Sequence, residues 1–283
     1  MKVGFHKMTG SGNDFVILDG RATTEAEWPA DGIAKVCGRR DGVGADGLVI
    51  LTPVGPGRVR MTYFNSDGSR AAMCGNAALC STRLAAQLGM ADPARMTLVT
   101  DAGDYAARCI GEGHLAEIHF PDALVPAAAA IPLAVGELSV ALGTVGVPHL
   151  VTVVADVAAV PLDARGRELR FHAGAGPAGA NANFVSRLPA SSDTSTPDPG
   201  APSWAIRTYE RGVEGETLAC GTGTVAAALA IAASGIDQLP LRFRSASGRA
   251  LSVAAVLHGD GQQATDIWLC GEGRLVFRGE WET

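Results

Sequence analysis

Two cysteines in this chain stand at matched places, each at the start of an alanine-rich run. Cys74 is followed by glycine and asparagine, and Cys220 by glycine and threonine. The first turn of a helix carries unpaired N–H groups and the positive end of the helix dipole, so it binds a carboxylate and stabilises a thiolate. The glycine after each cysteine lets a ligand come close to the backbone. The two segments therefore predict two thiols, each beside an anion-binding helix terminus.

A pair of thiols of this kind suits the inversion of an α-carbon. One thiolate removes the proton from one face, and the second thiol returns a proton to the other face. The Cα–H group of an amino acid is a very weak acid, so the carbanion needs preorganised N–H donors in a water-poor site. The sequence has no HExxH or CxxC segment and no recognisable Schiff-base lysine, so we expect a reaction without metal or other cofactor.

The elements that must carry the two thiols are helices packed against a sheet. Small or apolar residues recur at helical spacing from Cys74 to Gly89 and from Cys220 to Gly235, and a glycine closes each run. We interpret the other four cysteines, which lack such a setting, as packing thiols. These are Cys37, Cys80, Cys109 and Cys270.

The order of short motifs occurs twice along the chain. The separation between Gly12 and Gly146 is shorter than the separation between Cys74 and Cys220. The extra residues in the second separation fall within residues 188–203, whose proline, serine and threonine are typical of a solvated surface loop. The sequence therefore predicts an internal duplication with an inserted loop in its second copy.

Two related domains follow from this duplication, because its period is much longer than that of a solenoid repeat. The first domain is expected to comprise residues 1–118 with 272–283 and carries Cys74. The second is expected to comprise residues 119–271 and carries Cys220. The tail, residues 274–281, is expected to return to the first domain as a strand.

Composition narrows the class of protein. The chain has 283 residues, of which 47% are hydrophobic and 18% charged, so it has ample material for a core. A net charge of −6 without a lysine or arginine cluster argues against nucleic acid and anionic membranes as partners. No apolar run has the length of a membrane span, and the polar start is unlike a signal peptide. We expect a cytoplasmic protein that acts on a small molecule.

Five motifs make the chain resemble the diaminopimelate epimerase family over nearly its whole length and in the same order. They are GSGNDF, GVGADG, FNSDGSRAAMCGN, GANANFV and YERGVEGETLACGTGT. The resemblance implies an α/β fold of the α+β kind with two pseudo-symmetric domains. Each is a barrel-like, mostly antiparallel sheet around a central helix, with the active site in the cleft between them. It also implies conversion of LL-2,6-diaminopimelate to the meso isomer for lysine and peptidoglycan precursors, without cofactor, by a homodimer.

The motifs assign roles by position. Cys74 and Cys220 match the acid and base pair, and His149 matches a histidine thought to influence thiol pKa. Glu210 either holds an ammonium group or tunes a cysteine, and the Arg211 guanidinium suits a distal carboxylate because it binds one bidentately. The positions that match substrate-binding residues are Asn13, Asn65, Gly75, Asn76, Asn181, Glu210, Arg211, Gly221 and Thr222. We interpret Asp14 and Asp46 as turn or cap residues.

Two departures from the family pattern leave the identity of the substrate open. Val147 stands where the family commonly has asparagine before Pro-His, and Gly47 lacks the glutamine side chain of some members. A racemase of another amino acid on the same scaffold, such as histidine or proline, is therefore the nearest alternative. A protein that binds an amino acid without turning it over is a second, against which the two cysteines argue because binding needs neither thiol.

Overall fold

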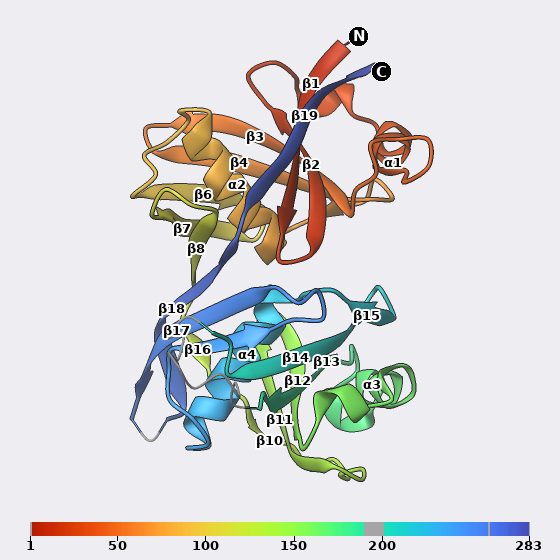
Figure 1. The fold of residues 1–283 in the computed structure, drawn as a ribbon, viewed down its shortest axis with the longest axis vertical. Helices are drawn as coiled ribbons and strands as arrows, with labels where there is room; N and C mark the ends of the chain where they lie inside the picture. Colours follow the sequence, from red (N-terminus) through yellow and green to blue (C-terminus); the bar gives the residue numbers. More distant parts are fainter. Residues whose placement is uncertain (1, 190–200, 260, 283) are drawn as a thin grey trace. The chain divides into compact units, whose positions relative to one another are not determined.

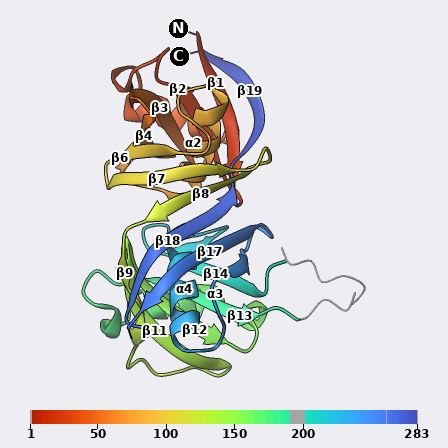
Figure 2. The ribbon, with the colours of Figure 1, turned by 90° about the vertical axis from the view of Figure 1, so that its left-hand side faces the viewer.

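The computed structural model describes residues 2–189, 201–259 and 261–282. Most of the loop expected at 188–203 lies outside these described residues. The chain divides into two compact units. Unit 1 consists of Met1–His119 and Cys270–Thr283, and unit 2 consists of Phe120–Leu269 (Figures 1 and 2).

Unit 1 is a curved, mostly antiparallel sheet. Its strands are β1 (Lys2–Gly10), β2 (Asn13–Asp19), β3 (Gly47–Gly55), β4 (Arg58–Asn65), β5 (Arg70–Ala71), β6 (Met96–Thr100), β7 (Gly103–Ile110), β8 (Leu115–Phe120) and β19 (Arg274–Glu282). Its helices are the 3-10 turn η1 (Glu25–Glu27), α1 (Ala30–Cys37) and α2 (Gly75–Gln87). Neighbouring strands pair in the order β19-β1-β2-β3-β4-β6-β7-β8, and only β2–β3 and β4–β6 are parallel.

Unit 2 repeats this plan. Its strands are β9 (Ala123–Leu124), β10 (Ala127–Ala128), β11 (Glu137–Val145), β12 (Val147–Val154), β13 (Asn181–Arg187), β14 (Trp204–Glu210), β15 (Gly215–Thr217), β16 (Leu241–Arg244), β17 (Ala250–His258) and β18 (Gln263–Glu272). Its helices are η2 (Val157–Ala159), α3 (Leu162–Arg170), η3 (Ala173–Ala175) and α4 (Gly221–Ala233). The two parallel pairs, β12–β13 and β14–β16, recur at the same places in the order.

The register of the strands makes the duplication specific to single residues. In unit 1, Val49 pairs with Ile17 on one side and with Tyr63 on the other. In unit 2, Asn183 likewise pairs with Val151 on a parallel neighbouring strand and with Thr208 on an antiparallel one. Positions on β12, β13 and β14 therefore correspond to positions on β2, β3 and β4, and α4 corresponds to α2.

Each unit is built around one helix that is buried on all sides. Residues Asn76 to Ala85 of α2 are buried without interruption, and α2 contacts strands around its whole circumference. Figures 1 and 2 show α2 enclosed by the strands of unit 1. In α4 the alanine-rich stretch from Gly223 to Ile231 is buried in the same way. A helix with small or apolar residues on every face belongs inside a core. The predicted barrel-like sheet around a central helix is confirmed in both units.

The two ends of the chain meet in unit 1. Strand β19 pairs antiparallel with β1 from Lys2 opposite Glu282 to Thr9 opposite Arg274, and Figure 1 shows the N- and C-termini side by side. The tail is therefore the return strand that the sequence predicted. Several short strands and turns were not predicted, and neither was helix α3, whose Gly166 packs so closely on Tyr209 that an added Cβ would lie 2.6 Å from the Cβ of Tyr209.

Candidate active site

Cys74 stands at the N-cap position of α2. Its backbone is extended (φ −138°, ψ 120°), and its carbonyl accepts the first helical hydrogen bond from Ala78 at 2.9 Å. The cysteine side chain does not cap the helix. A serine or aspartate at this position would hydrogen-bond to the N–H groups of the first turn, which this thiol does not do. The alanine-rich continuation forms the helix because alanine loses the least entropy on becoming helical.

Two predicted substrate-binding residues meet beside this helix end. The Asn76 amide donates to the Asn13 side-chain oxygen at 2.7 Å, and the Asn13 amide donates to Asp46 at 2.9 Å. Asp46 also accepts from the backbone N–H of Asp14 at 3.1 Å. The carboxylate therefore orients both amides, a role beyond the turn or cap position that the sequence suggested for it.

Asp14 belongs to an ion cluster next to these amides. It pairs with Lys7 at 2.7 Å and with Arg39 at 2.8 Å, and Arg39 also pairs with Asp46 at 2.6 Å. Burial alone would raise the pKa of Asp14, but the hydrogen bonds from Arg39 and Lys7 outweigh it and hold that pKa at about 2. The cluster is structural: it keeps the start of β2 in place.

Asn65 lies at the end of β4, the strand next to β3. Its side-chain amide donates to the Ser69 hydroxyl at 3.0 Å, and its backbone N–H donates to the Ser69 carbonyl at 2.9 Å. These two bonds close a turn over residues 65–69. Within the described part of the chain the Asn65 side-chain oxygen accepts no hydrogen bond, so a ligand can use it. Gly47 pairs with Asn65 across the ladder, and the Tyr63 ring fills the space beside it, since a Cβ there would lie 2.7 Å from the ring.

Three further thiols of unit 1 are unsuited to acid–base work. Burial raises the pKa of Cys37 to about 11, and burial also raises the pKa of Cys80 and of Cys109. A thiol that stays protonated at neutral pH is neither a base nor a nucleophile. Their interpretation as packing residues agrees with these environments.

Cys220 occupies the N-cap position of α4, as Cys74 does in α2. Its backbone is extended (φ −127°, ψ 108°), and its carbonyl accepts both the Thr224 N–H at 2.9 Å and the Thr224 hydroxyl at 2.8 Å. Its thiol again does not cap the helix, and its sulfur lies 3.6 Å from the Thr222 hydroxyl. The two cysteines thus have the same local geometry, each within its own unit.

Asn181, Glu210 and Arg211 lie together in unit 2. The Asn181 side-chain oxygen accepts the backbone N–H of Arg211 at 2.7 Å, which fixes the start of the turn after β14. Within the described part of the chain the Arg211 guanidinium forms no ion pair. A half-buried cation without a carboxylate partner suits an anionic ligand. Burial raises the pKa of Glu210, which makes its carboxylate a better proton acceptor.

His149 is fully buried on β12. Burial lowers its pKa to about 3, with the Val145 backbone opposing this shift and the Arg211 guanidinium adding to it, so the imidazole is neutral at physiological pH. Its Nδ1 lies 3.2 Å from the Asn183 amide nitrogen. The sequence did not single out Asn183. Asn183 stands out because it is a buried amide, whereas the corresponding residue of unit 1, Val49, is apolar.

Val147 begins β12 and pairs with Val145. It corresponds to Asn13, whose amide bonds to Asn76 in unit 1. Unit 2 therefore lacks an amide at this place, and the neighbouring Gly146 would bring a Cβ to 3.6 Å from the Thr222 methyl. The two helix termini thus differ in polarity, although their backbones correspond.

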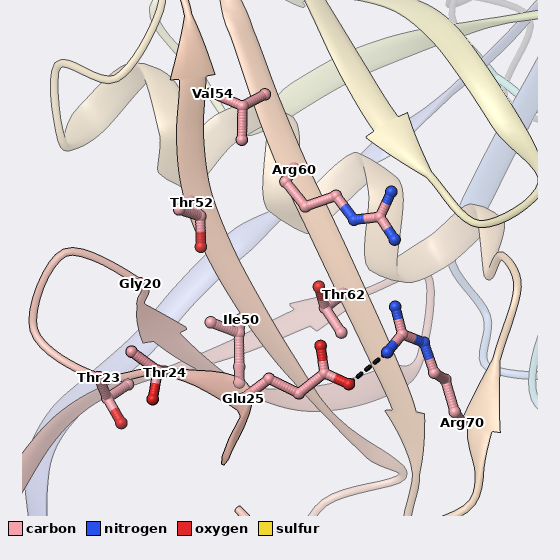
Figure 3. Close-up of a pocket in the computed structure, with 10 residues that line it drawn as sticks. All are labelled: Gly20, Thr23, Thr24, Glu25, Ile50, Thr52, Val54, Arg60, Thr62 and Arg70. Carbon is pink, nitrogen blue, oxygen red and sulfur yellow. Dashed lines mark hydrogen bonds and ion pairs between the residues drawn. The ribbon is translucent and has the colours of Figure 1, made fainter. Parts of the chain in front are cut away.

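A hollow elsewhere on unit 1 does not have the features of a catalytic site. Its volume is about 310 Å³, and Figure 3 shows Arg60, Arg70 and Glu25 at its rim together with Thr52 and Thr62. Arg70 is paired with Glu25 and with Asp101, and Arg60 is paired with Asp101. The guanidinium charges are already balanced, and no cysteine or histidine lines the hollow.

Neither a cluster of metal ligands nor a membrane-spanning helix occurs in residues 2–189, 201–259 and 261–282. In these ranges no three histidine, cysteine, aspartate or glutamate side chains gather in a way that suits a metal ion. No helix in the same ranges combines the length and the apolar character needed to cross a bilayer.

Known proteins resemble this chain in sequence over nearly its full length. The family model described as diaminopimelate epimerase matches residues 5–120 and 142–263. A diaminopimelate epimerase of Gemmatimonas aurantiaca is 42% identical over 285 residues, which cover 98% of this chain and 99% of the relative. A diaminopimelate epimerase of Aquifex aeolicus is 34% identical, covering 97% of this chain and 96% of the relative.

Solved structures share the fold at low sequence identity. A phenazine biosynthesis protein of the PhzF family from Bacillus anthracis has a TM-score of 0.74 at 14% identity, covering all of both chains. A hydroxyproline epimerase from Agrobacterium vitis, solved with bound trans-4-hydroxy-L-proline, has a TM-score of 0.65 at 17% identity and covers 99% of this chain and 92% of its own. At these identities the likeness concerns the fold.

Proposed function

The chain belongs to the diaminopimelate epimerase family, and from that premise we propose that Cys74 and Cys220 together invert one α-carbon of 2,6-diaminopimelate. The reaction interconverts the LL and meso isomers, a step of lysine and peptidoglycan precursor synthesis. The observation that carries this proposal is the matched placing of the two thiols. Each is an N-cap residue of a buried helix, and neither side chain makes a capping hydrogen bond to that helix.

The proton balance of the reaction is simple. One cysteine, as thiolate, takes the α-proton and becomes a thiol, while the electron pair stays on the α-carbon and its carboxylate. The other cysteine, as thiol, gives a proton to the opposite face and becomes a thiolate. The two cysteines have then exchanged protonation states, so each isomer meets the enzyme form that suits it. No oxidant, reductant or cofactor is needed for this balance, and we propose that none takes part.

The helix termini supply the stabilisation that such a weak carbon acid requires. The N–H groups at Gly75 and Asn76 and those at Gly221 and Thr222 are proposed to donate to the carboxylate of the reacting centre. Negative charge spreads onto that carboxylate as the proton leaves, so these donors bind the transition state more tightly than the substrate.

The remaining predicted residues are proposed to hold the rest of the substrate. Arg211, which lacks an ion pair within the described residues, is assigned to the distal carboxylate. Asn13, Asn65 and Asn181 are assigned to the distal amino acid group. Glu210 either binds its ammonium or accepts a proton from a thiol, and the raised pKa of its buried carboxyl supports the second role.

The cellular setting and the assembly belong to the same proposal. We place the enzyme in the cytoplasm, because a reaction that needs two reduced thiols is favoured where thiols are kept reduced. We propose a homodimer by resemblance to the family; Phe277 on β19 is half exposed, as interface aromatics are in a separated subunit. Sedimentation at micromolar concentration tests the dimer.

Incubation with LL-diaminopimelate in D₂O under reducing conditions tests the activity. Formation of the meso isomer with deuterium at the inverted carbon is expected, because the donating thiol equilibrates with solvent. The same incubation with histidine, proline and other amino acids tests the alternative that Val147 keeps open. Exchange with one of those and none with diaminopimelate would replace the substrate; no exchange with any would leave a binding protein.

Single cysteine variants test the roles of the two thiols. Cys74→Ser and Cys220→Ser are each expected to lose at least about 100-fold in kcat, the effect of removing a positioned general acid or base. Cys109→Ser is the matched control, since that thiol contacts the Thr82 carbonyl of α2 at 3.8 Å, and it is expected to keep full turnover. A doubly substituted enzyme with normal turnover would refute the two-thiol mechanism.

A further inference from the structure

A buried polar cluster lies beneath the N-terminus of α4, and the proposed chemistry above assigns it no role. It consists of His149 on β12, Asn183 on β13 and Thr208 on β14, all buried. The strands that carry these residues are adjacent in the sheet, and Asn183 and Thr208 are opposite each other in the ladder.

The orientation of the Asn183 amide is fixed by partners that allow one choice. Its nitrogen lies 2.9 Å from the Leu150 carbonyl, which only accepts, and its oxygen accepts the Thr208 hydroxyl at 2.9 Å. A flipped amide would place two oxygens together at Leu150. A longer contact of 3.5 Å to the Asn181 carbonyl lies on the same nitrogen side.

This orientation determines which nitrogen of His149 carries the proton. The Asn183 nitrogen, which can only donate, lies 3.2 Å from His149 Nδ1. Nδ1 must therefore accept, and a neutral imidazole then has its proton on Nε2. His149 Nε2 is buried and has no hydrogen-bond partner of normal geometry among the described residues. The Val145 backbone is close enough to the ring to raise the pKa of His149, but it forms no hydrogen bond of normal geometry with Nε2. A buried donor served so poorly is costly, and we infer that a ligand or a reacting group accepts its proton in turn.

Unit 1 shows that the fold does not require this cluster. The corresponding positions hold Phe15, Val49 and Tyr63, which are buried, and the Phe15 and Tyr63 rings pack edge to face with centroids 6.1 Å apart. Apolar side chains thus build the same strands in the same register. A buried polar network is expensive unless every member is satisfied, so its presence in unit 2 alone points to function.

The amide also lies next to the catalytic helix turn. A Cβ built at Gly223 would lie 2.2 Å from the Asn183 side-chain oxygen and 3.2 Å from the Cys220 sulfur. The amide and the thiol therefore flank the same face of Gly223. The residues that correspond to Gly223 and Asn183 in unit 1 are Ala77 and Val49, both fully buried.

We propose that Asn183 is a positioning residue that holds His149 as the tautomer with its proton on Nε2, so that the histidine serves the reaction as an N–H donor and not as a base. The catalytic consequence of this inference rests on the proposed function, whereas the tautomer itself does not. The donated hydrogen bond stabilises negative charge that forms during the reaction. Removing the Asn183 donor changes which nitrogen of the ring can act.

Nitrogen NMR of the ¹⁵N-histidine-labelled enzyme measures the tautomer without any substrate. The signals of His149 are identified by their absence in His149→Gln. At pH 7 the wild type is expected to show an unprotonated Nδ1 and a protonated Nε2. A protonated Nδ1 would overturn the proposal whatever the enzyme's activity, and this measurement needs no variant of Asn183.

Variants of the cluster then distinguish a positioning role of Asn183 from a merely structural role. In Asn183→Asp the carboxylate can only accept, so the proton is expected to move to Nδ1; in Asn183→Val the preference is expected to disappear. Thr208→Val is the control, because it leaves the Asn183 donor in place and should keep the wild-type tautomer. An unchanged tautomer in Asn183→Asp would refute the assignment.

Kinetics complete the test. Asn183→Asp is expected to lower kcat by about 10- to 100-fold, the effect of one hydrogen bond to a charged group, with KM within about twofold. A shifted tautomer with unchanged kcat would overturn the catalytic role and leave the proposed function intact. A wild type that does not epimerise diaminopimelate would instead refute the proposed function, while the NMR result still decides the tautomer.

Discussion

Replacing Gly223 with alanine is expected to destabilise unit 2, although alanine favours a helix over glycine by about 1 kcal/mol. The added methyl carbon would lie 2.2 Å from the Asn183 oxygen and 3.2 Å from the Cys220 sulfur. Side-chain carbons essentially never approach another heavy atom within 3.0 Å. The Asn183 oxygen must therefore move, or the N-terminal turn of α4 must.

The size of the effect follows from what holds the amide. Asn183 is bonded to the Leu150 carbonyl and the Thr208 hydroxyl, both at 2.9 Å, so moving its oxygen breaks at least one buried hydrogen bond. A buried group left unsatisfied costs about 1–3 kcal/mol, and overpacking a core costs about 1–3 kcal/mol. After the gain in helix propensity, the free energy of unfolding is expected to fall by about 3 kcal/mol.

The same substitution should lose its cost when Asn183 is valine. That double variant reproduces the pair Val49 and Ala77 of unit 1, which are both fully buried. In the Asn183→Val background, Gly223→Ala is expected to be neutral or stabilising by up to about 1 kcal/mol. The double-mutant cycle should therefore show a coupling of about 3 kcal/mol, at the upper end of values for residues in contact. Turnover should stay low in the double variant, because the donor to His149 is absent.

Urea unfolding followed by circular dichroism measures the cycle, with kcat and KM measured on the same samples. Gly32→Ala in α1 is the matched control, since its Cβ would lie at an ordinary 3.5 Å from Pro29 and should add about 0.5–1 kcal/mol. Additive effects of the two substitutions would refute the contact between Asn183 and Gly223. Full activity of the double variant would refute the role of Asn183 in catalysis.

Three other predictions rest on charges. Arg211→Gln is expected to raise KM for diaminopimelate by about tenfold or more through loss of a bidentate pair, whereas Arg40→Gln, at an exposed arginine, should leave KM unchanged in steady-state assays. Asp14 has its pKa lowered from 3.8 to about 2, so it contributes about 2 kcal/mol of stability that is fully present above about pH 5 and is lost as pH falls through about 2. Urea titrations should show Asp14→Asn less stable than wild type at pH 7 and equal to it below about pH 2. Arg165→Met leaves Glu137, its partner at 2.8 Å, buried without a counter-charge and should cost about 3 kcal/mol, most of which Arg165→Met with Glu137→Leu should recover in the same unfolding assay.

Sequence reasoning located the two helices that follow Cys74 and Cys220 within one or two residues of their observed bounds. The runs after Cys74 and Cys220 are long, rich in alanine and closed by glycine, so local preference and tertiary packing favour the same structure. The offsets between the two halves added the duplication, which no single segment reveals. These are signals that a single sequence carries well.

Helix α3 and the polar cluster were missed for a common reason. The α3 sequence, LDARGRELR, is charged and contains Gly166, and it is helical because that glycine packs on Tyr209 of β14, which is distant in sequence. The role of Asn183 depends on His149 and Thr208, which are 34 and 25 residues distant. Such features are set by partners that local spacing does not record.

The two units differ in ways that their duplication makes interpretable. Where both halves keep the same residue at corresponding positions, as with Cys74 and Cys220, the shared geometry is needed twice. Where they differ, the apolar copy shows what the fold alone requires and the polar copy shows what was added. Unit 1 has the Asn13–Asn76 hydrogen bond at the first turn of α2, and unit 2 has the His149–Asn183 pair, whose amide lies next to the first turn of α4. The proposed substrate has one reacting and one distal centre, which gives a reason for unsymmetric surroundings of the two thiols.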